Sequence, residues 1–331
     1  MMKSFTIHSE DGYSSFPRIC QDGINLYTVF RHAPVKVDET HIHYESMAII
    51  KRAVGGVMSW RMVGAPISAH IDDTGIQDPC LAVLEDGTFI LSYFHWRKPR
   101  RMDGIWIRRS FDKGRTWGNP MQITQHGHSV AACHPIIECG GGTLLLAVYD
   151  VAGCWLTRSF NGGTTWQEFI PIVKNTDYIE FSEPSLVYLD GGHILCALRT
   201  LDKRIGRSTW IYQTHGWNLG RWWQPPSATP MRGLPPSLLR LNDGRILCSY
   251  GYRRAPFGVR SCLSGDEGET WGIEREVVLR ADGADFDVGY PSSIQLDDER
   301  VLTAYYIHTE RNPTRRIEGT IWSIPKDGQH G

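Results

Sequence analysis

The chain has 331 residues, a net charge of −1, 21% charged residues and 41% hydrophobic residues, a balance typical of soluble globular proteins. A nearly neutral chain offers no electrostatic reason to expect nucleic acid or an anionic membrane surface as a partner. No apolar run approaches the ~20 residues of a transmembrane helix, and the stretch from Met1 to Glu10 lacks the apolar centre of a secretory signal. We therefore expect a protein that is cytoplasmic, or secreted with a leader absent from this chain.

The abundance of 12 tryptophans and 34 glycines suits an all-β protein with many turns. Eight cysteines lie mostly inside apolar, strand-like runs, with no CxxC or Cys/His spacing of a zinc site. We expect them to be buried free thiols.

An apolar strand, a tight turn and a second apolar strand recur along the chain. The turns are centred on Asp22-Gly23, Asp86-Gly87, Gly140-Gly141-Gly142, Asp190-Gly191, Asp243-Gly244 and Asp297-Asp298. Successive turns lie about 50–65 residues apart, close to the period of a four-stranded propeller blade. The pattern predicts one all-β domain over residues 1–331, a six-bladed β-propeller with four antiparallel strands in each blade.

A second repeat, S-x-[DN]-x-G-x-T-W, interleaves with these hairpins at residues 110–117, 159–166 and 264–271. Degenerate copies occupy residues 53–60 and 214–222, the latter with one extra residue. Such a segment makes a tight turn between strands, because Asp or Asn caps backbone N–H groups, Gly supplies a positive φ and Trp packs beneath. Five boxes for six hairpins imply that residues from both termini complete the sixth blade and remove its open edge.

The first strand of each hairpin is predicted to begin with a proline, because a strand tolerates proline at its first residue. These are Pro17, Pro79, Pro135, Pro184, Pro235 or Pro236, and Pro291. The residues beside them should ring one end of the central channel: Arg18, Asp78, His134, Glu183, Leu234 and Tyr290. The second strands return to the same end near Arg31, His95, Asp150, Arg199, Arg253 and Tyr306. So polar a ring predicts a binding site for an anionic or polyhydroxylated ligand.

The eight-residue repeat resembles the Asp box of the sialidase-type β-propellers, and the resemblance extends from Phe16 to about Trp322. In that family the box is structural and joins the third and fourth strands of a blade, on the face away from the active site. The resemblance implies that the Asp residues of the boxes are scaffold. It also implies a glycan substrate and no requirement for a cofactor or metal.

Three segments resemble parts of the sialidase active site. Residues 183–199 are similar to the family's E-P-x-x-x-x-x-D-G…R segment, which implies that Glu183 activates a tyrosine and that Arg199 binds the substrate carboxylate. The segment Gly289-Tyr290-Pro291 is similar to the one that holds the nucleophilic tyrosine. Arg18, in Phe16-Pro17-Arg18-Ile19, resembles the first of three carboxylate-binding arginines.

These residue types suit the implied chemistry. A phenol titrates near ~10, so a tyrosine needs a carboxylate that accepts its proton. A neutral nucleophile avoids charge repulsion at an anionic anomeric centre, and sialidases depart in this way from glycosidases with paired carboxylates. The planar arginine fork binds a carboxylate bidentately and stays charged.

The third arginine is left open among Arg253, Arg254 and Arg260, and we favour Arg253 because it ends a strand at the channel mouth. Arg31 ends a strand at the same mouth and joins the predicted substrate-binding residues together with Asp78 and His134.

The acid/base residue also has alternatives. In the family it is an Asp in the loop between the first hairpin and the first box, and here this loop holds Asp38, Glu39 and Glu45. We favour Asp38, seven residues past Arg31. Asp78 is the rival, because the proline pattern places it at the channel mouth.

The resemblance implies a retaining exo-sialidase that removes terminal α-linked sialic or related nonulosonic acid from glycoconjugates. Tyr290 would attack the anomeric carbon, Glu183 would assist it, and Asp38 would protonate the leaving oxygen and later activate water. Two alternatives remain. One is a propeller glycosidase or polysaccharide lyase for a uronic-acid or rhamnose-type sugar, with His134 in the site. The other is a glycan-binding propeller without activity.

Overall fold

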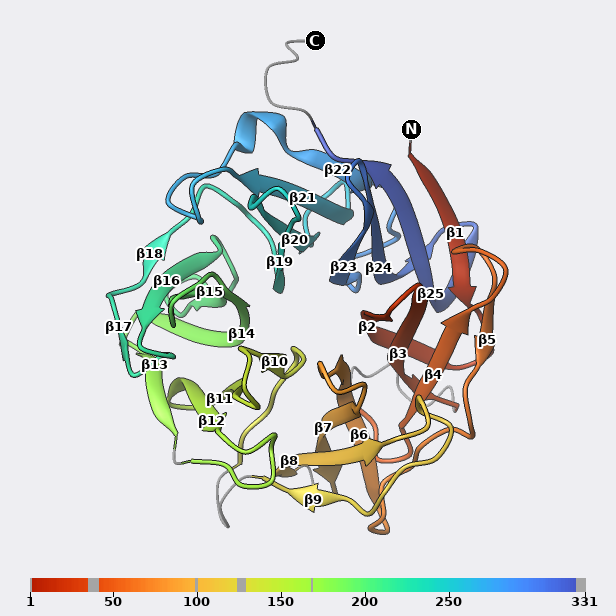
Figure 1. Ribbon diagram of the computed structural model, residues 1–331. Coiled ribbons are helices and arrows are strands. Elements are labelled where there is room, and N and C mark those ends of the chain that lie inside the picture. The colour runs from red at the N-terminus through yellow and green to blue at the C-terminus, as the bar shows by residue number, and fades with distance from the viewer. Residues whose placement is uncertain (1, 35–41, 99–100, 124–128, 168, 326–331) are drawn as a thin grey trace.

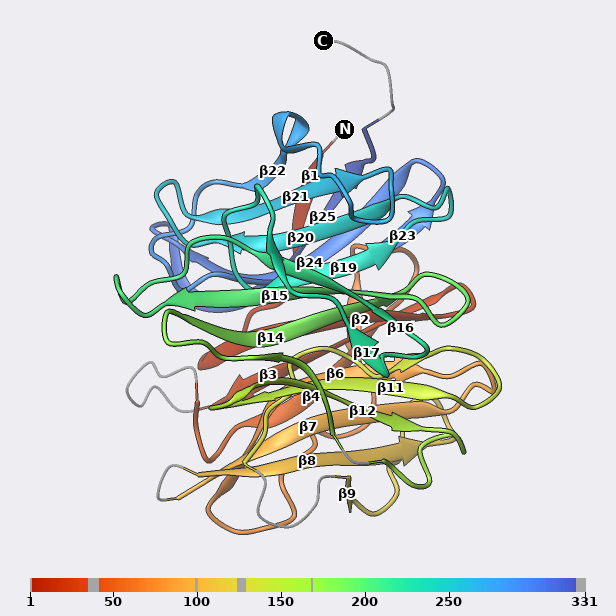
Figure 2. The same cartoon turned by 90° about the vertical axis from the view of Figure 1, so that its left-hand side faces the viewer.

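The computed structural model describes residues 2–34, 42–98, 101–123, 129–167 and 169–325. Six β-sheets stand around a central axis, as Figure 1 shows along the axis and Figure 2 from the side. A 3-10 helix at Ile273–Arg275 is the only helix among these residues. The prediction of an all-β, six-bladed propeller with four antiparallel strands in each blade is confirmed.

The strands of each blade follow one another from the axis outward. Blade 1 consists of β2 (Tyr13–Asp22), β3 (Asn25–Ala33), β4 (Met47–Ala53) and β5 (Trp60–Met62). Blade 2 consists of β6 (Thr74–Val83), β7 (Phe89–Arg97), β8 (Arg101–Ser110) and β9 (Met121–Gln122). Blade 3 consists of β10 (Ile137–Glu138), β11 (Leu144–Asp150), β12 (Gly153–Ser159) and β13 (Ile170–Lys174).

In blade 4 the outer strand is split into two short pieces that both pair with β16. This blade consists of β14 (Ile179–Tyr188), β15 (Ile194–Asp202), β16 (Tyr212–Trp217), β17 (Trp222–Trp223) and β18 (Ser227–Ala228). Blade 5 consists of β19 (Pro236–Arg240), β20 (Ile246–Tyr252), β21 (Gly258–Ser264) and β22 (Val277–Arg280). Blade 6 consists of β23 (Gly289–Asp297), β24 (Arg300–Thr309), β25 (Asn312–Ser323) and β1 (Lys3–His8).

The two ends of the chain complete blade 6, as the count of boxes and hairpins predicts. The N-terminal strand β1 pairs antiparallel with the last strand, β25, with Phe5 opposite Gly319. In Figure 1 the red β1 lies beside the blue β25. Both long edges of β25 are therefore paired, which removes an exposed edge that could pair with another chain.

The hydrophobic core is divided into six buried clusters, each between two neighbouring blades. The cluster between blades 6 and 1, for example, packs Ile7, Phe16 and Phe30 against Leu302 and Tyr306. All eight cysteines are free thiols; six are buried, and Cys20 and Cys139 are half-buried. No helix among the described residues has the length and the apolar character needed to cross a membrane.

Each of the three Asp boxes is built around a buried serine hydroxyl. Ser110 Oγ accepts hydrogen bonds from Gly114 N (2.9 Å) and Asp112 N (3.4 Å) and donates to Asp112 Oδ1 (2.8 Å). The boxes at Ser159 and Ser264 repeat these three contacts.

The degenerate box of blade 4 is shifted by one residue from its predicted position. Trp223, not Trp222, donates its indole N–H to Gly220 O at 3.0 Å, and Trp222 is 55% exposed. The extra residue in this copy moves the structural tryptophan one place along the chain.

Four of the six prolines do not open their inner strands, so the sequence interpretation is wrong for these blades, whereas Pro236 is the first residue of β19 as predicted. Pro17, Pro79, Pro184 and Pro291 lie inside β2, β6, β14 and β23, each at an interruption of the strand register. Because a bulge leaves one residue outside the hydrogen-bonded ladder, it accepts a residue that has no N–H group.

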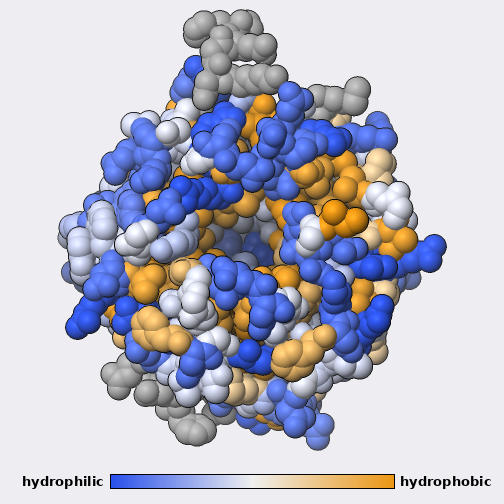
Figure 3. Space-filling view, viewed as in Figure 1, coloured by the Kyte–Doolittle hydropathy of each residue, from blue (hydrophilic) through white to orange (hydrophobic). Residues whose placement is uncertain are grey.

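The hairpin turns and Asp boxes lie together at the end of the propeller opposite these bulges; Lys113 in a box, for example, contacts Asp22 in a turn at 2.6 Å. At that end the inner strands of five blades surround a depression of about 630 Å³. Figure 3 shows the ring hollowed at its centre, with hydrophilic and hydrophobic residues around the rim.

We predict that Ser110→Ala lowers the free energy of unfolding by about 1–3 kcal/mol, because it leaves the buried Gly114 N–H without a partner. Urea denaturation checks this value, with Ser129→Ala at an exposed hydroxyl as the matched control. Equal stability of the two variants would contradict the structural role given to the box serine.

Candidate functional site

The candidate site lies at the end of the channel where the inner strands bulge. At four bulges the residue before proline has a positive φ: Phe16 (56°), Asp78 (42°), Glu183 (49°) and Tyr290 (47°). This conformation costs a non-glycine residue free energy, and such strain is concentrated at functional sites. A bulge also redirects a side chain, and three of these four residues are predicted site residues.

The centre of the site is a buried contact between blades 6 and 4. Tyr290 donates its phenolic O–H to Glu183 Oε1 at 2.6 Å, and Arg199 Nη1 donates to the same oxygen at 2.7 Å. Tyr290 is 6% and Glu183 4% exposed, and Glu183 Oε2 has no hydrogen-bond partner among the described residues. The carboxylate is thus held by one cation and is in place to accept the phenolic proton.

Close backbone packing brings Tyr290 into this position. A Cβ atom on Gly289 would lie 2.7 Å from Gly251 Cα, so the start of β23 can approach β20 only because both residues are glycines. Burial, and then the Glu183 carboxylate, raise the pKa of Tyr290 well above its usual value, although Arg199 and Arg253 oppose this rise. The phenol is therefore protonated at neutral pH and becomes a nucleophile only by transfer of its proton.

Asp78 is the second carboxyl group of the site and comes from blade 2. Its side chain has no hydrogen-bond partner among the residues that the structure describes. Burial, and then the Glu183 carboxylate, raise the pKa of Asp78 to about 7, against the effect of three nearby cations, Arg18, Arg31 and Arg199. A carboxyl group with such a pKa exchanges its proton near neutral pH, as a general acid and base must. The other candidates, Asp38 and Glu39, lie outside the described residues, and Glu45 is exposed.

Two of the predicted arginines lie beneath the surface of the site. Arg18 donates to Cys133 O at 2.7 Å and to Pro291 O at 3.0 Å, and it is 2% exposed. Arg31 is fully buried and donates to Ser15 Oγ at 3.3 Å. Burial lowers the pKa of Arg31 to about 10, so it stays charged at neutral pH. Both cations act on Asp78 through the electrostatic field rather than through a hydrogen bond.

Arg253 is the arginine that the structure places beside Tyr290, with its guanidinium 5.5 Å from the centre of the phenol ring. It donates to Val288 O and to Tyr306 Oη, both at 3.1 Å. Tyr306 in turn donates to Asp287 Oδ1 at 2.8 Å, so a buried carboxylate holds this arginine through a tyrosine.

The two alternatives to Arg253 lie elsewhere. Arg254 donates to Ser208 O at 3.1 Å, and Arg260 pairs with Glu276 between the outer strands of blade 5. Among the three sequence candidates, Arg253 is thus the one beside the tyrosine.

His134 also reaches the site region but is deeply buried beside Arg18. Burial and this cation lower its pKa well below the usual value, and its Nε2 atom has no hydrogen-bond partner among the described residues. Two other members of the predicted ring face away. His95 stacks on Trp106 inside blade 2, and Asp150 accepts hydrogen bonds from the turn that follows it.

The sequence analysis missed Tyr149, Tyr13 and Asp287. Tyr149 lies close enough to Glu183 and Asp78 for their charges to raise its pKa, after the larger effect of burial. It precedes Asp150, so the alternation of strand side chains could have identified it. Asp287 accepts from Tyr13 at 2.6 Å across blades, and no local sequence pattern marks that contact.

The arrangement provides a tyrosine beside a carboxylate that can accept its proton, a carboxyl group whose pKa is raised to about 7, and four cations around them. These are the parts that acid/base-assisted substitution on an anionic substrate requires. Among the described residues, one group of three side chains could hold a metal ion, and it lies outside this site at His8, Glu10 and His32.

Comparisons with solved structures agree with this architecture. A protein of unknown function from Dyadobacter fermentans has a TM-score of 0.84 and 25% sequence identity, with 98% of this chain and 99% of that chain covered. A Hadza microbial sialidase has a TM-score of 0.73 and 18% identity, with 94% of this chain and 66% of that chain covered. An α-L-arabinanase from Penicillium chrysogenum, solved with arabinobiose, has a TM-score of 0.74 and 13% identity, with 97% of each chain covered.

At 18% and 13% identity, the likeness to these two glycoside hydrolases is one of fold. No curated protein matches the chain in sequence. The family model described as the BNR repeat-like domain matches residues 61–307. The match covers most of the chain, including four of the five box segments, and the chain therefore belongs to the BNR repeat-like domain family.

Proposed function

We propose that this protein is a retaining glycoside hydrolase of the exo-sialidase type, which removes a terminal α-linked sialic or related nonulosonic acid. The observation that carries the proposal is the buried contact of Tyr290 with Glu183, on an oxygen that Arg199 also binds. A glycan-binding surface needs no proton acceptor behind a tyrosine, whereas a tyrosine nucleophile does.

In the first step, Glu183 takes the phenolic proton while Tyr290 Oη forms a bond to the anomeric carbon. The bond between that carbon and the leaving oxygen breaks, and Asp78 gives its proton to this oxygen. The product is a covalent glycosyl-tyrosine and a released aglycone. Arg199 stabilises the carboxylate of Glu183 before the transfer and faces the anionic sugar after it.

In the second step, the ionised Asp78 takes a proton from water, whose oxygen attacks the anomeric carbon. The bond to Tyr290 breaks, and Glu183 returns its proton to the phenolate. Two displacements at the same carbon retain its configuration. Asp78 acts as acid and then as base, which suits a pKa of about 7.

The substrate class follows from the charge of the site. Arg199 and Arg253 have partly exposed side chains and would contact the sugar carboxylate, whereas Arg18 and Arg31 would add positive potential from beneath. Four cations face two carboxyl groups, Asp78 and Glu183, of which one is protonated below pH 7. The excess of positive charge favours an anionic sugar over a neutral one.

We predict that the purified protein releases the fluorophore from a fluorogenic α-sialoside and that Tyr290→Phe lowers kcat by roughly 10³-fold or more, the scale seen when an acting nucleophile is removed. The variant should keep its circular dichroism spectrum and its affinity for sialic acid. Tyr178→Phe, at an exposed tyrosine, is the matched control.

Unchanged turnover in Tyr290→Phe would contradict the tyrosine mechanism. If the wild type cleaves only a uronide, a rhamnoside or an arabinoside, the sialic acid assignment is wrong. His134→Ala then tests the alternative in which this histidine takes part.

The proposed role of Asp78 predicts a pH dependence. Activity should fall as the pH rises through about 7, because Asp78 then loses the proton that the leaving oxygen needs. Asp78→Asn should remove this limb and lower kcat by about 10²–10⁴-fold for an unactivated glycoside, and by less for an aryl glycoside. Asp38→Asn is the parallel variant; if it alone removes the limb, Asp38 is the acid/base.

Stability provides a second readout for the same group. The folded protein holds the Asp78 proton up to about pH 7, whereas the unfolded chain loses it near 3.8. Folding therefore binds a proton in this window, and the contribution to stability is lost as the pH rises through it. The melting temperature of the wild type should fall relative to that of Asp78→Asn between pH 5 and 8.

The proposed contact with the carboxylate predicts that Arg253→Gln lowers kcat/KM for the anionic sugar by about 10- to 100-fold. This factor corresponds to the free energy that a hydrogen bond to a charged group contributes. Binding of sialic acid should weaken more than binding of its methyl ester, as measured by calorimetry. Arg254→Gln is the neighbouring control. Equal weakening for acid and ester would show that Arg253 serves packing alone.

A further inference from the structure

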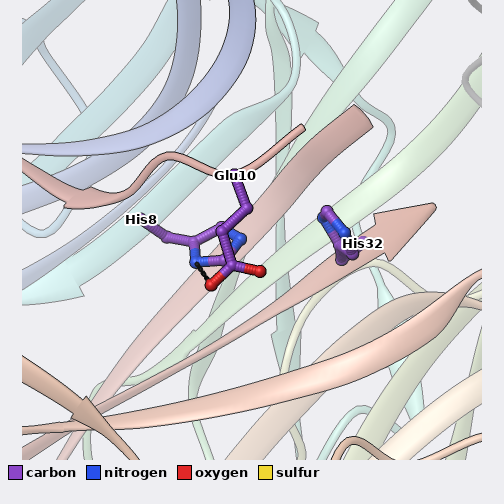
Figure 4. Close-up of side chains that lie close together, drawn as sticks. All are labelled: His8, Glu10 and His32. Carbon is purple, nitrogen blue, oxygen red and sulfur yellow. Dashed lines mark ion pairs between the residues drawn. The ribbon is translucent and has the colours of Figure 1, made fainter. Parts of the chain in front are cut away.

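Three side chains with metal-binding donor atoms meet where the last blade joins the first. His8 ends β1, Glu10 follows it in the connection to β2, and His32 lies near the end of β3. One donor atom from each lies within 4.8 Å of the others. Figure 4 shows the Glu10 side chain extending toward His8, with His32 on its other side.

The ring nitrogens of His8 are available to bind a metal ion. His8 is 2% exposed, and neither of its ring nitrogens has a hydrogen-bond partner among the described residues. An unpartnered polar side chain in the interior costs free energy, so its presence calls for a ligand.

His32 is buried and oriented by a neighbour. Its Nδ1 atom lies 2.9 Å from Ser14 Oγ. With the proton on Nδ1, the hydroxyl accepts a hydrogen bond and the Nε2 lone pair is available. A second partner of this kind orients most metal-binding histidines.

Glu10 is the adaptable member of the group. Its side chain is 64% exposed, and Oε1 lies 3.8 Å from His8 Nδ1. Ligands bound at ~2.0–2.2 Å around a tetrahedral zinc ion stand ~3.5 Å apart. The donor atoms lie within 4.8 Å of one another, so small movements of the three side chains, above all of this solvent-exposed carboxylate, would bring them to that spacing.

We propose that His8, Glu10 and His32 bind a divalent transition-metal ion, with Zn²⁺ as the best match. Two imidazoles with one carboxylate form a donor set found in zinc sites, and the imidazole nitrogens suit zinc better than calcium or magnesium, which prefer oxygen alone. Water would fill the fourth position on the exposed side of Glu10.

The position of the site indicates a structural role. A bound ion would connect the outer strand of blade 6 to the second strand of blade 1, at the junction where the chain closes its ring. Such a link stabilises the folded state by mass action, because the unfolded chain does not hold the ligands together.

Two cations oppose binding. Lys51 lies close enough to lower the pKa of His8, after the larger effect of burial, and it donates to Ile7 O at 3.0 Å. Arg31 lies next to His32 in the chain and also acts on it. Removal of the Lys51 charge should therefore strengthen metal binding.

The test uses the full chain without an affinity tag, freed of metal by a chelator and titrated with Zn²⁺ in a calorimeter. We expect one ion per wild-type chain and a rise of at least about 2 °C in melting temperature at saturation. Glu10→Gln should weaken binding by about tenfold or more and remove the thermal shift. Asp11→Asn, at the exposed neighbouring carboxylate, should change neither.

Lys51→Gln provides a test with the opposite sign, because it should tighten Zn²⁺ binding several-fold. Glu10 is exposed and Lys51 is half-buried, so we expect both variants to fold and their changes in affinity to report on the metal site. Wild-type affinity in Glu10→Gln, or no binding by the wild type, would overturn the proposal; the first result would assign the ion to the cysteines or other histidines.

Discussion

The candidate site depends on one backbone constraint, a residue in the left-handed region directly before a proline. The constraint recurs in the inner strands of four blades. In each case the interrupted ladder accommodates the proline, and the preceding side chain leaves the regular alternation of the strand. The strain is tolerated because the strand continues on both sides of the bulge and packs against neighbouring blades. Asp78, Glu183 and Tyr290 owe their convergence to this repeated irregularity.

The burial of so many charges would be costly without compensation. Glu183 is paired with Arg199 and accepts a hydrogen bond from the phenol of Tyr290. Asp287 accepts from two tyrosines and from Arg315, and it thereby holds Arg253 in place. Asp78 has no such partner in the part of the chain that the structure describes, and its proton is correspondingly hard to remove. The same site thus contains one carboxylate, Glu183, that is bound by a cation and a phenol through Oε1, and one carboxyl group, Asp78, whose pKa is raised to about 7.

Much of the fold could be predicted from the sequence because turns and boxes are local. The Asp-Gly turns and the S-x-[DN]-x-G-x-T-W segments encode their hydrogen bonds within eight residues, so they predict six blades and the closure by both termini. Positions inside the strands were harder. The pattern places prolines at strand starts, whereas four of them lie at bulges, and the box tryptophan of blade 4 is Trp223 and not the expected Trp222.

The site was predictable where a short segment of the sequence identifies the residue, as for Glu183, Arg199 and Tyr290. It was not predictable where the contact joins distant blades. The link from Asp287 to Tyr13 spans 274 residues, and the approach of Gly289 to Gly251 depends on backbone packing. The choice among Arg253, Arg254 and Arg260 required the structure, because all three lie within one hairpin and the sequence does not show which of them faces Tyr290.

The pairing of β1 with β25 has a consequence for the order of assembly. Ser4 Oγ meets Thr320 Oγ1 at 2.8 Å across 316 residues of sequence, nearly the whole chain. During synthesis β1 leaves the ribosome long before its partner strand β25 has been made. Until then β1 is a free strand whose backbone N–H and C=O groups have only water as partner. The contact closes the longest loop in the molecule, so we expect it to form late and slowly, after the other blades have folded.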